Sequence, residues 1–459
     1  MHFKSISEIS EEIMRKKITS SEVTSRILER ISIRDAKSCS YITVTAERAM
    51  QQAAVADKEI SQGLWRGPLH GVPLGIKDII YTDFAKTTAG TAIHRDFRPT
   101  FNATVVNRLE TAGAVTLGKL TTTEQAFADH HPSVKAAVNP FGEEYYSGVS
   151  SSGSGVSVAD GLAYGSLGSD TGGSIRAPSG ANNITGVKPT WGRVSRHGVF
   201  ALADSLDHIG PMARSAVDAA IMLGAIAGQD SNDPTALRAA VPDYLSACAA
   251  GIQGLRIGMP RAFACENTEQ EISNAWQYTA DVLCSLGAET RDITFPEWRK
   301  AVADWIALCS PETARAHQEF YPSRKDEYGP VLANFIETGR KLSAIDYVNA
   351  NLGRIAFSAL YRKLFSEVDI FLIPVFPRAL PKASEWLEIA DSQFIDFTRF
   401  FIPADITGSP TVTFPVGADR NGMPIAMQVC GPHLSEDVLL KVVANFQRVT
   451  SHHLRRPVD

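Results

Sequence analysis

Short apolar runs alternate with helical segments along the chain, and this alternation constrains the fold more than any other feature. Residues 67–80, GPLHGVPLGIKDII, have the apolar, β-branched texture of a strand bounded by Gly and Pro. The helix-like ATVVNRLETAG (residues 103–113) leads at once into the strand-like AVTLGKL (residues 114–120). Such units supply a sheet with helices on its faces, so the sequence predicts an α/β fold.

The same alternation recurs towards the C-terminal end. The strand-like ITGSPTVTFPVG (residues 406–417) and PIAMQVCGP (424–432) are followed by the helical SEDVLLKVVANFQRV (435–449). We therefore expect both ends of the chain to contribute strands to one sheet.

The first sixty residues are predicted to be helical. Residues 19–22, TSSE, have the pattern of a capping box, in which the Thr and Glu side chains accept from backbone N–H groups at a helix start. Residues 44–62 are rich in Ala, Glu and Gln and predict a second helix. We expect a helical lead-in over residues 1–62 that packs on a main domain over residues 63–459.

Composition excludes several classes of protein. Of the 459 residues, 44% are hydrophobic and 21% are charged, so a large core can form without metals or disulfides. The net charge is −5 without a run of five like charges, which disfavours a nucleic-acid partner. No apolar window is long enough to span a membrane and no secretory signal is visible, so a cytoplasmic location is expected. The six cysteines form no CxxC pair and are expected to be buried free thiols.

Residues 295–401 are rich in aromatic side chains and mostly helical in pattern. Aromatic residues at such spacing belong to the core more often than to a pocket.

Residues 147–176, SGVSSSGSGVSVADGLAYGSLGSDTGGSIR, raise the choice between a flexible linker and an active site. The stretch encloses a short helix and strand pattern, which a linker avoids. It lacks the Lys of a phosphate-binding loop and the third Gly of a dinucleotide fingerprint. Arg176 replaces the last Gly of the GxSxG hydrolase elbow, and the chain contains no Ser-x-x-Lys pair.

The segment GSDTGGS (residues 168–174) is then the strongest candidate for a catalytic loop. Its small residues allow several backbone N–H groups to point into one space, which suits a developing oxyanion next to the Ser174 hydroxyl. No His lies within twenty residues of Ser174, and the fallback bases His197 and His208 are better explained by structural roles.

Lys77 is the best candidate for the base, because it ends a strand-like run and would point inwards. Burial would have to lower its pKa from about 10.4 before it could accept a proton. The alternative is a surface lysine that pairs with Asp78.

Four motifs taken together resemble the amidase signature family, whose enzymes use a Ser-Ser-Lys triad. They are GVSSSGS (148–154), GSDTGGSIRAP (168–178), GVKPTWGRVSRHG (186–198) and SLDHIGPMAR (205–214). The resemblance covers roughly residues 5 to 450. It implies an α/β/α sandwich with a large mixed twisted sheet covered by helices, and an amidohydrolase that needs no metal or organic cofactor.

The resemblance assigns a role to each matching residue. It implies that Ser174 is the nucleophile, Ser150 the bridging serine and Lys77 the base. A cis peptide bond is expected at Val149–Ser150 or next to it.

It further implies backbone oxyanion donors at Thr171, Gly172, Gly173 and Ser174. Ser151 and the pair Asp170 and Arg176 are expected to support the loop. Because the base is a lysine, activity should rise towards alkaline pH, and a fall between pH 7 and 9 would contradict this assignment.

The chain also departs from the family pattern. Val149 and Ser152 replace two usual glycines, so we expect an altered pocket wall near Ser150. GKLTTTEQAFADHHPSV (residues 118–134) stands where glutamine-hydrolysing subunits of tRNA-dependent amidotransferases carry an NMDEFAMGSS-like segment, which weakens but leaves open that alternative. A catalytically silent binding relative is the other alternative.

The preferred interpretation is an amidase that cleaves the C–N bond of a small aryl or apolar amide through an acyl-enzyme. The resemblance implies that substrate choice lies in the variable region over residues 295–401 and in the loop over residues 125–146. Homodimers are common among similar enzymes, so a homodimer is an expected assembly.

Overall fold

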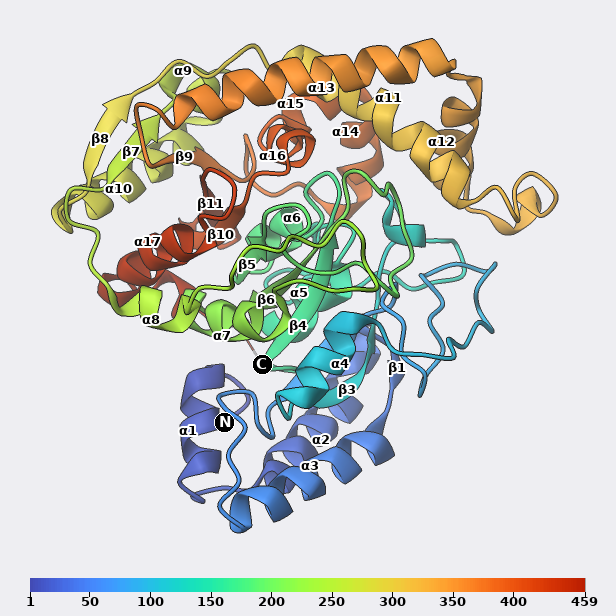
Figure 1. Ribbon diagram of the computed structural model, residues 1–459, viewed down its shortest axis with the longest axis vertical. Helices are drawn as coiled ribbons and strands as arrows, with labels where there is room; N and C mark the ends of the chain where they lie inside the picture. Colours follow the sequence, from blue (N-terminus) through green and yellow to red (C-terminus); the bar gives the residue numbers. More distant parts are fainter. Residues whose placement is uncertain (459) are drawn as a thin grey trace.

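The computed structural model describes residues 1–458, in which eleven strands form one mixed sheet (Figure 1). The strand order is β1-β3-β2-β4-β6-β5-β10-β11-β9-β7-β8. The strands are β1 (Tyr41–Val44), β2 (Pro73–Lys77), β3 (Val115–Leu120), β4 (Gly165–Asp170), β5 (Thr185–Lys188), β6 (His208–Ala213), β7 (Arg256–Met259), β8 (Glu289–Asp292), β9 (Ile370–Pro374), β10 (Thr411–Ala418) and β11 (Pro424–Cys430). The predicted α/β class is confirmed.

The middle of the sheet is buried on both faces. Every residue of β2, β3 and β4 is buried, and β2 runs parallel to both of its neighbours. Strands that helices cover on both faces have continuous runs of apolar and small residues instead of an alternating pattern. The C-terminal strands β10 and β11 join the same sheet beside β5, as expected from the sequence.

Two separate groups of helices pack on the sheet. The helices α5 and α6 contact each other and the strands β4, β5, β10 and β11, whereas α7, α8 and α17 form a second group. The helices of residues 1–458 are α1 (Ile6–Met14), α2 (Ser20–Ser38), α3 (Ala46–Ser61), α4 (Thr104–Thr111), α5 (Ser152–Ala159), α6 (Arg176–Ala181), α7 (Ala216–Ile226), α8 (Tyr244–Ala249), α9 (Arg261–Cys265), α10 (Gln270–Ser285), α11 (Arg299–Ala316), α12 (Pro330–Lys341), α13 (Ala344–Leu364), α14 (Trp386–Ser392), α15 (Phe394–Thr398), α16 (Ile402–Thr407) and α17 (Glu436–Val449).

The N-terminal segment contains the predicted helices and one strand besides. The capping box at Thr19 and Glu22 begins α2, and α3 matches the second predicted helix. The additional strand β1 pairs antiparallel with β3, so the lead-in also extends the sheet. The division into residues 1–62 and 63–459 stays a prediction, and its last residue, 459, lies outside the described residues.

Residues 295–401 are mostly helical, as predicted, and hold α11 to α15. The buried strand β9 was missed, because five apolar residues in a helical context give no periodicity of their own. Figure 1 shows α11, α12 and α13 together along the edge of the molecule opposite to α1, α2 and α3.

The cysteines are free but only partly buried. All six carry free thiols, of which Cys248, Cys309 and Cys430 are buried, while Cys284 is exposed. The expectation of uniformly buried thiols was therefore wrong for half of them.

Across residues 1–458, we find no helix with both the length and the apolarity needed to cross a bilayer.

Candidate active site

Lys77 is the last residue of β2, and its side chain is fully buried. Its Nζ donates to Ser150 Oγ at 2.7 Å, to Ser151 Oγ at 2.9 Å and to Ser169 Oγ at 2.8 Å. The alternative of a surface pair with Asp78 is wrong, because Asp78 forms a buried ion pair with Lys119 instead, at 3.1 Å. The three partners of the Lys77 amine are thus all neutral hydroxyls.

Burial lowers the pKa of Lys77 to about 7. Desolvation disfavours the ammonium form, and the more distant carboxylates of Asp170 and Asp207 counteract it only in part. At neutral pH a substantial fraction of this amine is therefore unprotonated and able to accept a proton.

The loop over residues 147–151 lies between Lys77 and the loop that carries Ser174. The peptide bond between Val149 and Ser150 is cis, at the position that the resemblance implies. Ser151 donates through its Oγ to Ser169 O at 3.1 Å, and its N–H donates to Ser174 O at 3.3 Å. These bonds hold the Ser150 loop against the loop that carries Ser174.

Ser174 lies on the turn between β4 and α6 and is half-buried. Asp170, the last residue of β4, accepts from the N–H of Gly173 at 2.8 Å and from the N–H of Ile175 at 2.9 Å. Gly173 has φ 116°, and a Cβ there would lie 2.7 Å from the ring of Phe401. Only glycine therefore fits this position of the turn.

The predicted pair of Asp170 and Arg176 is present and fully buried. Arg176 donates through Nε and Nη2 to the two oxygens of Asp170, at 3.1 and 2.9 Å. Burial alone would raise the pKa of Asp170, but the Arg176 guanidinium outweighs it and holds that pKa well below its usual range.

A second carboxylate, which sequence reasoning missed, completes this cluster. Asp405 on α16 accepts from Arg176 Nη2 at 2.6 Å, so the guanidinium lies between two carboxylates. Nothing in the surrounding residues IPADIT marks Asp405 as part of a site. The fallback bases have other partners: His208 contacts the Asp170 carbonyl and Lys188, and His197 stacks on Phe101.

The geometry narrows the predicted oxyanion donors. Because the Gly173 N–H already donates to Asp170, it is not free to bind an oxyanion in this arrangement. The N–H groups of Thr171, Gly172 and Ser174 stay predicted donors. Thr171 and Gly172 line the same cavity as Ser174.

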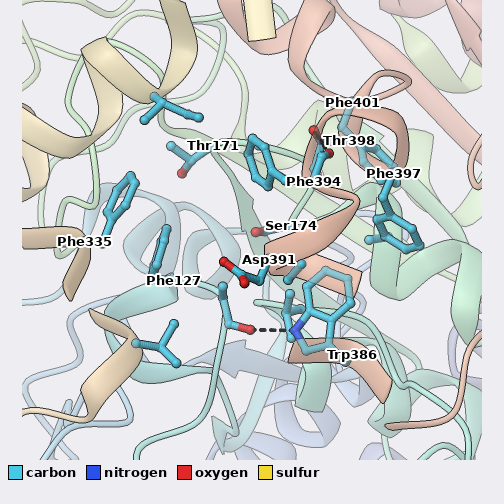
Figure 2. Close-up of a pocket in the computed structure, with 18 of the residues that line it drawn as sticks. Phe127, Thr171, Ser174, Phe335, Trp386, Asp391, Phe394, Phe397, Thr398 and Phe401 are labelled. Atoms are coloured by element: carbon cyan, nitrogen blue, oxygen red, sulfur yellow. Dashed lines mark hydrogen bonds between the residues drawn. The ribbon is translucent and has the colours of Figure 1, made fainter. Parts of the chain in front are cut away.

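A cavity of about 710 Å³ opens over Ser174. Figure 2 shows that aromatic rings surround it, contributed by segments far apart in the sequence. The aromatic residues in its wall are Phe127, Tyr146, Trp305, Phe335, Trp386, Phe394, Phe397 and Phe401. Six of them belong to residues 295–401, so that region supplies pocket as well as core.

The two departures from the family pattern differ in their effect. Val149 lines the cavity, as expected for an altered pocket wall. Ser152 does not line it: the residue begins α5, and its Oγ lies 3.1 Å from Nε2 of His130. The expectation that both residues reshape the pocket holds for Val149 alone.

Comparison with known proteins settles the family. The family model described as Amidase matches residues 22–440. The chain belongs to the amidase family. It is accordingly an amidohydrolase, and its fold is the predicted amidase signature fold.

Several relatives cover nearly the whole chain. AmiD of Mycobacterium tuberculosis (strain ATCC 25618 / H37Rv), named as an amidase, is 41% identical, over 98% of this chain and 95% of its own. The glutamyl-tRNA(Gln) amidotransferase subunit of Geobacter sp. (strain M21) is 34% identical, over 98% of each chain. The solved peptide amidase from Stenotrophomonas maltophilia superimposes with a TM-score of 0.83 at 27% identity, over 99% of this chain and 98% of that one.

The burial of Lys77 predicts a measurable pH dependence of stability. Between pH 7 and 10, unfolding would let Lys77 take up a proton, so rising pH favours the folded state. We expect the free energy of unfolding of the wild type, minus that of Lys77→Met, to increase over this range by up to about 1.4 kcal/mol per pH unit. Urea titrations of both proteins at pH 7, 8, 9 and 10 measure it, and a flat or falling difference would contradict the lowered pKa.

Proposed function

We propose that this amidase hydrolyses the C–N bond of a small aryl or apolar amide through an acyl-enzyme on Ser174. The observation that supports it most is the Lys77 amine, which is buried, has its pKa lowered to about 7 and lies 2.7 Å from Ser150 Oγ. Such an amine can serve as a base without a histidine.

In the proposed mechanism, Ser150 relays a proton between Lys77 and Ser174. Ser150 gives its proton to Lys77 Nζ and takes the proton of Ser174, whose Oγ attacks the amide carbon. The N–H groups of Thr171, Gly172 and Ser174 bind the oxyanion. Collapse of the tetrahedral intermediate breaks the C–N bond, and the relay returns the proton to the leaving nitrogen. Water then attacks the acyl-enzyme by the same relay, which releases the acid and restores Ser174.

The substrate class follows from the cavity wall. Eight aromatic side chains line about 710 Å³, a volume suited to a small organic ligand. Apolar and aryl groups lose water on entering such a cavity and stack on its rings.

The steps of the proposed mechanism need neither a metal nor an organic cofactor. Within residues 1–458, no cluster of three or more His, Cys, Asp and Glu could hold a metal ion.

A glutamine-hydrolysing role with partner proteins is the alternative, favoured by the amidotransferase relative at 34% identity. The segment that departs from that subgroup contributes Ala126, Phe127 and Ala128 to the cavity wall, which would present an apolar surface to a glutamine side chain. Hydrolysis of simple amides by the purified chain alone would favour the amidase role.

The cytoplasmic location stays a prediction.

Replacement of Ser174 tests the mechanism. We expect Ser174→Ala to reduce amide hydrolysis at least about 10³-fold with an unchanged circular dichroism spectrum, because the nucleophile is lost while the fold is kept. Ser179→Ala is the matched control: this buried hydroxyl five residues away has no hydrogen-bond partner in the described structure, so activity should be retained. Retained hydrolysis in Ser174→Ala would overturn the assignment.

A panel of anilides and short aliphatic amides tests the proposed substrate class. The anilides should be turned over faster than the aliphatic amides.

We also propose that α13 forms the interface of a homodimer. Its outer face carries Ile345, Val348, Leu352 and Ile355, which are 67, 51, 59 and 64% exposed. Their spacing of three and four residues is that of a coiled-coil seam. Figure 1 shows α13 lying along the outer edge of the molecule, where a partner can reach it.

The charges of α13 suit a second copy in antiparallel orientation. Asp346 lies in the first turn, and Arg362 and Lys363 lie in the last. A twofold axis across the helix would place each acidic end opposite the basic end of the partner, which favours this pairing over a parallel one.

Substitution of one seam residue tests the dimer. Leu352→Glu should raise the dimer dissociation constant at least about 10-fold, because a buried carboxylate replaces an apolar contact. Leu454→Glu, at an exposed leucine outside α13, should leave it unchanged. Sedimentation velocity over a range of concentrations gives the dimer dissociation constants of the wild type and of both variants. A monomeric wild type, or a dimer that Leu352→Glu leaves intact, would refute the interface.

A further inference from the structure

We propose that Asp391 forms a subsite for a positively charged group of the substrate, so that the preferred amides carry a protonated amine on an aryl or apolar body. This inference rests on the proposed function and specifies its substrate class. It is carried by the position and surroundings of one side chain.

Asp391 is the only charged side chain among the described residues that line the cavity. The wall otherwise consists of aromatic, aliphatic and small residues and a few neutral polar ones, among them Asn334, Thr338 and Thr398. No lysine or arginine of the described chain faces this space, so its fixed charge is negative.

The sequence of α14 turns Asp391 towards the cavity. Leu387, Ala390 and Asp391 all line it, at the spacing of three and four residues that marks one helical face. Glu388 falls outside that face and does not line the cavity. Figure 2 shows the Asp391 carboxylate among Phe127, Trp386 and Ser174, in the space over the proposed nucleophile.

The helix that carries Asp391 is held in place by contacts of Trp386 with two other segments of the cavity wall. Trp386, at the start of α14, donates through its indole N–H to Ala128 O at 2.9 Å and stacks on Tyr146 with ring centroids 4.4 Å apart. Asp391 therefore projects from an anchored element into the cavity.

The carboxylate of Asp391 has no protein partner. Within residues 1–458 it makes neither a hydrogen bond nor an ion pair, whereas the buried carboxylates of Asp170 and Asp405 both bind Arg176. Asp391 is exposed, so its carboxylate lies where the cavity opens to solvent and attracts a cationic group of a bound substrate through its charge. A neutral substrate gains nothing from this charge, and an anionic one is repelled.

The rings beside Asp391 add to the preference for a cation. An ammonium group that reaches the carboxylate also enters a cavity lined by aromatic side chains, among them Phe127 and Trp386 (Figure 2). The negative face of an aromatic ring attracts a cation, and more so where water is excluded. Carboxylate and rings thus select the same chemical class, an organic cation with an apolar body.

Matched substrate pairs test this subsite. One pair is 4-(aminomethyl)benzamide and 4-ethylbenzamide, with the charge on the acyl side; the other is the acetanilides that carry the same two substituents, with the charge on the amine side. For the wild type we expect kcat/KM to be higher for the ammonium member of at least one pair. Asp391→Asn should lower that ratio about 10-fold, which corresponds to about 1.4 kcal/mol, mainly through KM. The neutral members should change by less than about 2-fold.

Glu388→Gln is the matched control, because it removes the same charge from the same helix, one turn away and outside the cavity. It should leave the ratio unchanged, which separates a local contact from the general field of the helix. If Asp391→Asn leaves both ratios unchanged while hydrolysis continues, the subsite is refuted and the amidase function stands. If neither member of any pair is hydrolysed by the wild type, the proposed function fails with these substrates and the cationic preference fails with it.

Discussion

The structure depends on a lysine amine that is buried without a carboxylate to neutralise it. Lys77 ends a fully buried strand, and its three contacts are the hydroxyls of Ser150, Ser151 and Ser169. Hydroxyls satisfy the hydrogen bonds of an amine but do not stabilise its charge as a carboxylate would, so burial lowers the pKa to about 7. A residue that is ordinarily an acid at neutral pH thereby becomes able to act as a base.

Arg176 organises the buried acidic side chains beside the Ser174 turn. Arg176 donates to both Asp170 and Asp405, while Asp170 also accepts from the N–H groups of Gly173 and Ile175. The same carboxylate therefore shapes the turn on which Ser174 lies. In this way, the buried ion pairs set the geometry of the turn, while the desolvation of the charged groups opposes their Coulombic contribution to stability.

Much of the site could be predicted from the sequence, because its residues lie in contiguous motifs. Local patterns singled out Lys77 and Ser174, and the resemblance of these motifs to the amidase signature family added Ser150 and the Asp170–Arg176 pair. Asp405 could not, since it is 229 residues from its partner and its neighbours carry no signal. Asp391 was missed because one carboxylate on a short helix carries no signal of its own, and only the folded chain shows that this exposed residue lines the cavity. Among the strands, β1 and β9 escaped because both lie in segments whose sequence pattern is otherwise helical.

The central claim is that unprotonated Lys77 activates Ser174, and the most direct test is the rate at which a fluorophosphonate reacts with Ser174 as a function of pH. Followed in single turnover from pH 5 to 9, the rate constant should rise with a midpoint near 7 and then level off, as the lowered pKa of Lys77 requires. Lys77→Met should react slowly and without this rise. A wild-type rate that is independent of pH across the range, or a Lys77→Met protein that keeps the same profile, would contradict the account.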